Sequence, residues 1–461
     1  MSMAAAAISE NLGAIVGPAQ VITNSQQLRA YGAGGRTPKA AIRPGSDQEV
    51  AEVVRFARTE KLTLMPTGAR TKRDMNIPTA EFDLALDMGR LDRVVAYDPG
   101  DLTLSVEAGL PLASLAGVLA EHQQLLPLVV PFLNRATVGG TVASGVDSPL
   151  RQFYGTARDY VLGMEFVTGD GRVVKSGGRV VKNVSGYDLH KLMIGSFGSL
   201  GVITKVNFRT FPLWTSMRAL LARFVSARDA VEMRHRIAQS PLRPLTLEIL
   251  SPKAAELLFR DLEVPVPFDP PPIGAPSKAP WALLVSFAGT ARVLERYERD
   301  LRQLAGAGEA AVLDESSTAA ALARVREFSP IALESSPFAV IIRMNVLPGE
   351  MAQALDAAAL AAARQELPWA AMARGVGVID FALLPGRPPG QRSTAGRVIE
   401  GVFEAFGHRE GSITIPWCRE EYKEAMPARR TPPHDLEQMR KIREAFDPTK
   451  VFAPDPLQAW I

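Results

Sequence analysis

Cysteine is nearly absent from this sequence, in which Cys418 is the single one among 461 residues. One thiol excludes an intrachain disulfide, and it excludes an iron–sulfur cluster or a Cys-rich zinc site held by this chain alone. Such sparing use of cysteine is typical of a reducing compartment, so we expect a cytoplasmic protein. Histidine is scarce too: the five histidines include no pair at helix or zinc spacing, and we predict no metal site.

Long hydrophobic runs and a charge bias are also missing. The most apolar stretch, residues 125–133, contains Pro127 and Pro131 and is much shorter than the ~20 residues that span a bilayer. Residues 1–11 carry no basic region ahead of their short alanine run, which argues against a signal peptide. The 52 Lys plus Arg nearly balance the 49 Asp plus Glu, and no stretch combines basic residues with aromatics. We therefore expect no nucleic-acid partner, and membrane contact only through partner proteins.

Three common nucleotide-binding or catalytic motifs are absent as well. No Gly-x-Gly-x-x-Gly follows a predicted strand, no Walker A sequence occurs, and no Gly-x-Ser-x-Gly elbow is present. A Rossmann dinucleotide fold, a P-loop nucleotidase and a serine hydrolase are therefore unsupported. With 47% hydrophobic and 22% charged residues, the chain is nevertheless typical of a folded protein with room for about three domain-sized units.

Hydrophobic periodicity divides the chain into two folded regions. The sequence Ser46-Asp47-Gln48-Glu49 predicts a helix start, and short apolar runs alternate with turns and amphipathic helices after it. We predict strands at residues 62–65, 84–88, 102–108, 161–168, 172–175 and 201–208, and again at 244–250, 281–287, 338–346 and 376–384. These elements suggest a leader at residues 1–40, a first domain at 41–213, an α+β domain at 214–415 and a C-terminal segment at 416–461.

Three segments of the first domain combine small residues with polar or basic ones. Residues 131–145 and 195–204 are rich in glycine, which lets a backbone approach a flat or anionic ligand and present amides to phosphate oxygens. Residues 65–73 follow a predicted strand and include Arg70, Lys72 and Arg73, which suit a pyrophosphate clamp. Each segment alone is equally compatible with a tight turn or a solvated basic loop.

In this order the segments resemble the flavoproteins of the vanillyl-alcohol oxidase and D-lactate dehydrogenase type, whose FAD-binding domain is named after p-cresol methylhydroxylase (PCMH). The resemblance rests on Pro66-Thr67-Gly68, Ala136-Thr137-Val138-Gly139-Gly140, the segment from Tyr154-Gly155 and Gly198-Ser199-Leu200-Gly201. It implies an α+β fold, in which a two-subdomain PCMH-type FAD-binding domain is followed by an α+β cap domain and a C-terminal segment that returns to the FAD domain. It also implies FAD as the cofactor, bound non-covalently because the first loop lacks histidine and the second lacks cysteine.

The resemblance also implies which residues contact FAD. They are Pro66, Thr67, Gly68, Ala69, Arg70, Thr71, Pro131, Ala136, Thr137, Val138, Gly139, Gly140, Ala143, Ser144, Gly145, Tyr154, Gly155, Asp159, Gly198, Gly201, Val202 and Ile203. Oxidation of a 2-hydroxy acid further needs a base for the hydroxyl proton and a cation for the carboxylate. The candidates are Lys182, Arg343 and His190, with Arg374 as a further cation, and an ordinary packed or salt-bridged side chain is the alternative for each.

Within this family, residues 182–189 and 148–151 are most similar to the E subunit of bacterial glycolate oxidase, also called glycolate dehydrogenase. This similarity implies an FAD-binding subunit that works beside a homologous catalytic D-type flavoprotein and an iron–sulfur F-type subunit, in the oxidation of glycolate to glyoxylate. The His-Ala-Gly-Asp-Gly-Asn-x-His element of the family's dehydrogenases is missing near residues 375–380. Two alternatives stay open, a stand-alone FAD-dependent alcohol or 2-hydroxy-acid oxidoreductase and a non-catalytic scaffold or electron-transfer subunit.

Overall fold

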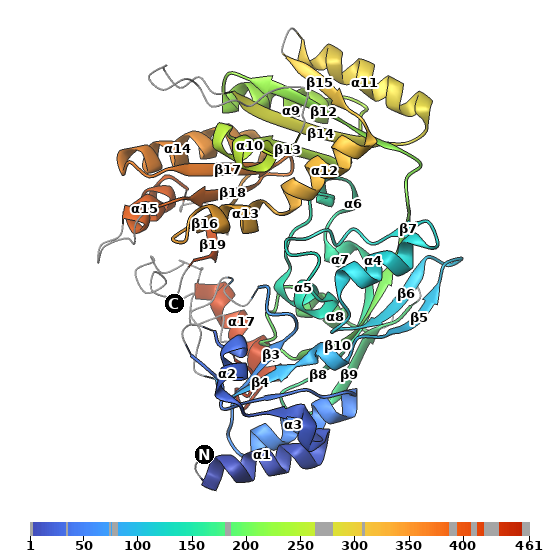
Figure 1. The fold of residues 1–461 in the computed structure, drawn as a ribbon, viewed down its shortest axis with the longest axis vertical. Coiled ribbons are helices and arrows are strands. Elements are labelled where there is room, and N and C mark those ends of the chain that lie inside the picture. Colours follow the sequence, from blue (N-terminus) through green and yellow to red (C-terminus); the bar gives the residue numbers. More distant parts are fainter. Residues whose placement is uncertain are drawn as a thin grey trace.

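Three principal β-sheets organise the chain, two in a first domain and one in a second (Figure 1). The computed structural model describes residues 3–33, 36–72, 75, 82–179, 186–262, 280–306, 309–386, 394–406, 413–418 and 433–453. The first domain occupies the lower part of Figure 1 and the second domain the upper part. Within the described residues, no helix is both long enough and apolar enough to cross a membrane.

The smaller sheet of the first domain has the strand order β1-β2-β4-β3. Its strands are β1 (Val21–Ile22), β2 (Ala40–Ile42), β4 (Leu84–Asp87) and β3 (Leu64–Thr67). The last three run parallel, and α3 (Asp47–Thr59) connects β2 to β3, starting where the Ser46 hydroxyl accepts a hydrogen bond from the Glu49 amide. The helix α1 (Met3–Val16) packs on α3 with Leu12 and Val16 buried. The described N-terminal residues therefore contribute to the core of the first domain.

The larger sheet of the first domain is antiparallel, with the strand order β5-β6-β10-β8-β9. Its strands are β5 (Val94–Asp98), β6 (Thr103–Glu107), β10 (Val202–Arg209), β8 (Val161–Val167) and β9 (Val173–Gly177). The helices beside it are α4 (Leu112–Ala120), α5 (Val138–Ser144), α6 (Arg151–Tyr154), α7 (Ala157–Tyr160) and α8 (Leu189–Met193). Leu64 of β3 and Val167 of β8 belong to the same hydrophobic cluster, so the two sheets share part of their core.

The last described segment returns to the first domain. The helix α17 (Pro433–Phe446) is followed by Asp447, whose carboxylate accepts hydrogen bonds from the amides of Val451 and Phe452 at 2.9 and 2.8 Å. The Leu64 amide donates to the Val451 carbonyl at 2.7 Å, and the Ala453 amide donates to the Leu64 carbonyl at 2.8 Å. Residues 451–453 therefore extend the smaller sheet beyond β3.

The second domain is an eight-stranded antiparallel sheet with the order β15-β12-β14-β13-β17-β18-β16-β19. Its strands are β12 (Met217–Phe224), β13 (Thr246–Leu250), β14 (Trp281–Ala288), β15 (Ala310–Leu313), β16 (Val340–Asn345), β17 (Trp369–Arg374), β18 (Val378–Leu383) and β19 (Ile413–Trp417). One face is covered by α9 (Ala227–Gln239), α11 (Ala291–Ala305), α14 (Met351–Arg364) and α15 (Thr394–Phe406).

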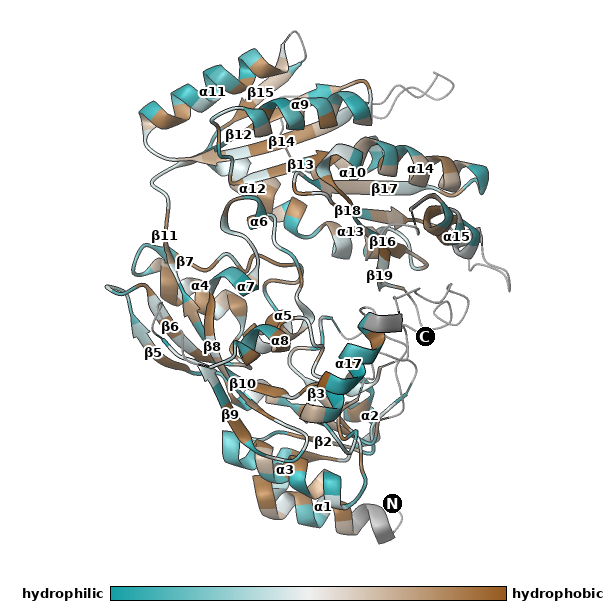
Figure 2. Cartoon of the chain, turned by 180° about the vertical axis from the view of Figure 1, so that it is seen from behind, coloured by the Kyte–Doolittle hydropathy of each residue, from teal (hydrophilic) through white to brown (hydrophobic). Residues whose placement is uncertain are grey.

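The other face of this sheet carries α10 (Pro252–Phe259), α12 (Glu315–Arg326) and α13 (Phe328–Ser335) and looks toward the first domain. Apolar residues pack on both faces, and the outer helices α9 and α11 show teal, hydrophilic residues on their outward sides in Figure 2. The second domain therefore sits as a cap over the first, with one sheet face directed at it.

Candidate functional site

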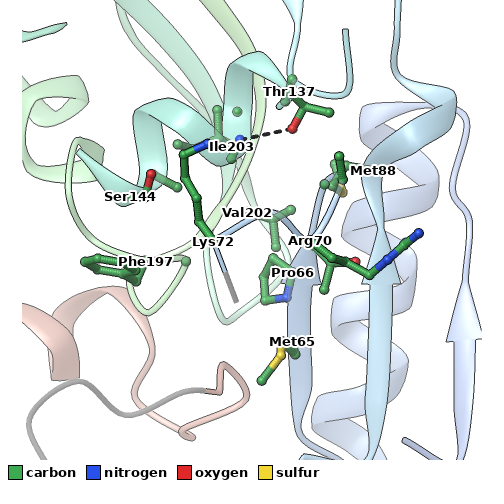
Figure 3. A pocket seen from close by; sticks show the side chains of 18 of the residues that line it. Met65, Pro66, Arg70, Lys72, Met88, Thr137, Ser144, Phe197, Val202 and Ile203 are labelled. Atoms are coloured by element: carbon green, nitrogen blue, oxygen red, sulfur yellow. Dashed lines mark hydrogen bonds between the residues drawn. The ribbon is translucent and has the colours of Figure 1, made fainter. Parts of the chain in front are cut away.

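A cavity opens in the first domain where the loop after β3, the first turn of α5 and the loop before β10 converge (Figure 3). It encloses about 990 Å³ of space, part of which is open solvent. Most of the predicted cofactor-binding residues line it, namely Pro66, Thr67, Gly68, Ala69, Arg70, Thr71, Thr137, Gly139, Gly140, Ala143, Ser144, Gly198, Gly201, Val202 and Ile203. The fold thus brings three segments that are distant in sequence to one place.

The loop after β3 forms one wall of the cavity. Gly68 passes so close to Thr137 that a Cβ atom on Gly68 would collide with the Thr137 hydroxyl. Arg70 has a positive φ of 61°, which turns the chain back along the cavity. The amides of Ala69, Arg70 and Thr71 have no hydrogen-bond partner among the described residues. Successive free amides in a turn of this kind form a concave site for an anion.

The first turn of α5 forms a second wall and differs from the expectation for it. The Val138 amide donates to the Leu110 carbonyl at 3.0 Å, and the Gly139 amide donates to the Ala108 carbonyl at 2.7 Å. These two amides are therefore unavailable to a phosphate, because they tie the helix to the strand beside it. A Cβ on Gly139 would lie 2.6 Å from the Ala108 Cβ, whereas a Cβ on Gly140 would meet only the Thr137 hydroxyl, at 3.1 Å.

The two described basic residues of the first loop point in opposite directions (Figure 3). Arg70 places its guanidinium 3.4 Å from the Asp87 carboxylate and 4.4 Å from the centre of the Tyr31 ring. The Tyr31 hydroxyl donates to the same carboxylate at 2.6 Å, and burial together with this acceptor raises the pKa of Tyr31 to about 12. Arg70 is thus already paired with protein groups.

Lys72, in contrast, turns its ammonium into the cavity wall without an acidic partner. The Lys72 side chain is buried, and its Nζ lies 3.3 Å from the Thr71 hydroxyl and 3.5 Å from the Pro131 carbonyl. No carboxylate of the described residues lies within 4 Å of it. Burial lowers the pKa of Lys72 to about 8. Among the described residues, the Lys72 ammonium has only these two long contacts. An anionic ligand beside it would therefore stabilise its charge.

Several predicted cofactor-binding residues lie outside the cavity lining, namely Pro131, Ala136, Val138, Gly145, Tyr154, Gly155 and Asp159. Ala136 and Val138 are buried in the hydrophobic core, and Gly145 ends α5 with a left-handed φ of 60°. The Asp159 carboxylate accepts a hydrogen bond from the Thr156 amide at 2.7 Å and so caps α7. These residues shape the elements around the cavity.

Other residues line the cavity but are outside the predicted set, namely Met65, Lys72, Met75, Met88, Ala108 and Phe197. Most are apolar, and an apolar side chain at the end of a strand carries no motif that distinguishes a pocket from the core. Lys72 could have been included, because it stands in the same basic loop as Arg70.

The catalytic candidates do not meet at this cavity. Arg343 lies on β16 of the second domain and makes a bidentate ion pair with Asp380, at 2.7 and 3.0 Å. His190 is buried on α8, with Nδ1 at 3.0 Å from the Ser176 hydroxyl, and burial lowers its pKa. Lys182 lies outside the described residues. Among the described residues, no cluster of three or more His, Cys, Asp or Glu side chains is arranged to hold a metal.

Two family models match the chain in the order of its two domains. Residues 38–177 match the FAD binding domain, and residues 215–384 match the C-terminal domain of FAD linked oxidases. The chain combines an FAD binding domain with an FAD-linked oxidase C-terminal domain. The cavity lies within the FAD binding domain and its closing strand β10, and FAD is accordingly the cofactor.

Related proteins cover the chain to different extents. Glycolate oxidase subunit GlcE of Escherichia coli is 35% identical over 201 residues, which span 43% of this chain and 56% of that protein. Glycolate oxidase subunit GlcD of Bacillus subtilis is 23% identical over 428 residues, or 92% of this chain and 89% of that protein. Shorter matches include a D-2-hydroxyglutarate dehydrogenase, of which the chain spans 36%, and a D-lactate dehydrogenase, of which it spans 50%.

Solved structures support the same two-domain fold. The structure of p-cresol methylhydroxylase superposes with a TM-score of 0.75, covering 100% of this chain and 98% of that one at 16% identity. The predicted PCMH-type FAD-binding domain with an α+β cap is therefore confirmed.

The residues of the cavity fit FAD on two independent grounds. Free amides at residues 69–71 and the buried Lys72 ammonium suit an anionic group. Gly140 leaves the cavity wall open where a side chain would stand.

Proposed function

We propose that this chain is the FAD-binding subunit of a complex that oxidises glycolate, or a related D-2-hydroxy acid, with electrons passing through its flavin. The cavity of the FAD binding domain carries this proposal, because its free amides and unpaired Lys72 suit the cofactor on which the reaction depends. The glycolate oxidase subunits among the relatives support the choice of substrate class. Oxidation of glycolate at its hydroxyl carbon yields glyoxylate.

The residues that would hold FAD have two roles: some would bind its anionic oxygens, and others leave room for it. The amides of residues 69–71 and the Lys72 ammonium would bind anionic oxygens, while Gly140 and Gly198 let the backbone approach the cofactor. Arg70 would stay with Asp87 and Tyr31 and hold the loop in place. When bound, FAD supplies an acceptor for the hydride that a 2-hydroxy acid loses on oxidation.

The described residues offer few groups for the rest of this reaction. Arg70 and Lys72 are the only titratable side chains among the described residues that line the cavity. Both cap arginines that could hold a substrate carboxylate, Arg343 and Arg374, are ion-paired with Asp380. A base for the hydroxyl proton and a free cation for the carboxylate would therefore come from a homologous, catalytic D-type flavoprotein subunit.

Electron delivery beyond FAD would also need a partner. Cys418 is the one cysteine of the chain and is buried, so this chain alone cannot ligate an iron–sulfur cluster. We infer an iron–sulfur F-type subunit in a cytoplasmic complex that reaches the inner membrane only through its partners.

Two alternatives to this proposal are a stand-alone FAD-dependent oxidoreductase for another alcohol or 2-hydroxy acid, and a non-catalytic scaffold. Turnover of glycolate and D-lactate with an artificial electron acceptor separates them, measured on the purified chain and then on the chain mixed with D-type and F-type partners. Activity only in the mixture supports the proposal. Comparable activity of the isolated chain would establish the stand-alone enzyme instead.

A further inference from the structure

A cluster of buried charges joins the cap to the FAD binding domain. On the cap face that looks toward the FAD binding domain, Arg343 and Arg374 both contact Asp380, and the Arg374 to Asp380 distance is 3.3 Å. Arg374 also lies 3.9 Å from Asp147, which belongs to the FAD binding domain. Asp147 pairs in turn with Arg151 at 3.0 Å. The buried Arg374 and the partly buried Arg343 are thus balanced by two buried aspartates across the contact between domains.

Glu248 is a further acidic residue in this cluster and has no such partner. It lies on β13 directly opposite Arg374 of β17, and none of its surface is exposed. Neither of its carboxyl oxygens has a hydrogen-bond partner, and the same holds for the Arg374 Nε and the Gln152 Oε1. Gln152 stands on α6 of the FAD binding domain and touches the cap beside Gly375. We call Asp147, Gln152, Glu248, Arg374 and Asp380 the domain joint.

The contacts of Glu248 suit a neutral carboxylic acid better than a carboxylate. An ionised carboxylate buried without hydrogen-bond donors loses its hydration and gains nothing in return. Arg374 offsets this loss only in part, since its guanidinium also pairs with Asp147 and Asp380. A protonated Glu248 carries no charge, so its burial avoids most of this loss, and its hydroxyl needs only one acceptor.

We propose that Glu248 binds a proton at neutral pH. Because of this proton, the equilibrium between the closed and the opened domain joint depends on pH. Burial, opposed by Arg374 and reinforced by Asp147 and Asp380, raises the pKa of Glu248 to about 8 in the closed protein. Opening of the domain joint would return the carboxyl to water, where a glutamate titrates near pH ~4.3. The opened form therefore binds fewer protons between these two values.

The sign of the effect follows from this difference. The closed joint is most stable below about pH 4.3, loses stability as pH rises, and loses no more once pH exceeds about 8. Within that window the equilibrium constant for opening rises about tenfold per pH unit. Although burial opposes them, the neighbouring Asp147 and Asp380 raise the pKa of Arg374, so Arg374 keeps its charge throughout. Although burial opposes it, pairing with Arg343 and Arg374 lowers the pKa of Asp380, so Asp380 remains ionised in this window.

Hydrogen exchange of the FAD-loaded protein tests the proposal through the Glu248→Gln variant. The amide keeps the size and neutrality of the protonated acid but cannot ionise. We compare the variant with the natural protein at equal pH, on peptides covering β13, β17 and residues 147–152, so that the intrinsic pH dependence of exchange cancels. The ratio of opening constants, natural protein to variant, should rise about 100-fold from pH 5.5 to 7.5.

The matched control is Glu256→Gln on α10, because Glu256 is a partly exposed cap glutamate that pairs with Lys253 at 2.8 Å and Arg260 at 2.7 Å. For Glu256→Gln, the ratio of opening constants, natural protein to variant, should not change with pH. A ratio for Glu248→Gln that also stays constant between pH 5.5 and 7.5 would overturn the proposal.

Infrared spectroscopy of the natural protein provides a test that does not depend on the folding of a variant. A protonated carboxylic acid has a carbonyl stretch distinct from that of a carboxylate, and Asp380 of the joint is held in the carboxylate form by Arg343 and Arg374 although burial opposes them. We expect one acid band at pH 7 that disappears as pH rises past about 8. Absence of the band at pH 6.5 would refute protonation of Glu248. Neither experiment measures turnover, so the outcome is independent of the proposed reaction.

Discussion

Replacement of Gly140 by valine should remove FAD from the protein while leaving the fold intact. A Cβ on Gly140 would meet only the Thr137 hydroxyl, at 3.1 Å, so the protein itself tolerates a side chain there. The same residue lines the cavity, and the valine methyl groups would stand in the space that the cofactor needs. Gly139 differs, because its Cβ would lie 2.6 Å from the Ala108 Cβ and 3.0 Å from the Ala108 carbonyl.

The two effects of Gly140→Val have different magnitudes. A glycine-to-valine change in a helix gains a few tenths of a kcal/mol in helix propensity, so the free energy of unfolding should change by less than about 1 kcal/mol. Loss of close approach by FAD should weaken binding at least about 100-fold, or ~2.7 kcal/mol. Gly139→Ala should instead destabilise the apoprotein by about 1–3 kcal/mol through overpacking.

The assay is the flavin content of the purified protein, followed by titration of the apoprotein with FAD and by thermal unfolding. Gly117→Val is the matched control, since Gly117 is an exposed glycine of α4 with no atom within 4 Å of an added Cβ. We expect the control to retain FAD and Gly140→Val to lose it at a similar unfolding temperature. Normal FAD content and affinity in Gly140→Val would refute the position of the cofactor.

Three other substitutions or treatments have defined outcomes. Acid precipitation should release all flavin into solution, and flavin that stays with the precipitate would show a covalent link. Lys72→Met should weaken FAD binding about tenfold or more in a fluorescence titration, because it removes the unpaired ammonium. Arg70→Met, the control in the same loop, should have a smaller effect, and equal losses would argue against a special role of Lys72. Asp447→Ala should lower the free energy of unfolding by about 1–3 kcal/mol in a denaturant titration, since the amides of Val451 and Phe452 lose their acceptor. An unchanged midpoint would mean that the C-terminal return adds little stability.

The sequence predicts the cavity well because its features are local. Gly68, Gly139 and Gly201 occur where a strand or helix must pass another element closely, and glycine is the residue that permits this. Ser46 likewise predicts the start of α3 from its own side chain. Such positions depend on few neighbours, so the type and order of the residues are sufficient to predict the local structure there.

Long-range partners cannot be predicted in the same way. The Arg70 guanidinium pairs with Asp87 and Tyr31 and so points away from the cavity. These two partners lie beside Arg70 only after β4 and the N-terminal segment have packed next to β3. The strands β12 and β17 also escape prediction, because alanine and arginine in their sequences favour helices and the strands are stabilised by their neighbours in the sheet.

Glu248 is a charged residue whose long-range partners, too, could not be predicted from the sequence. It is the single acid of the apolar strand β13, and alternation places it on the face opposite to Leu247 and Ile249. From the sequence alone this alternation would place Glu248 toward solvent, whereas the structure buries it completely. Its neighbours Arg374 and Asp147 come from another strand and another domain, so its protonation state follows only from the assembled structure.

Turnover of the reconstituted complex with the Gly140→Val chain tests most directly whether electrons pass through the FAD of this chain. The chain is combined with its D-type and F-type partners, assembly is verified by size-exclusion chromatography, and reduction of an artificial acceptor by glycolate is followed. The account predicts an assembled complex that has lost acceptor reduction, whereas the Gly117→Val complex retains it. Full turnover by an assembled complex that contains the flavin-free Gly140→Val chain would contradict the account and leave the chain a scaffold.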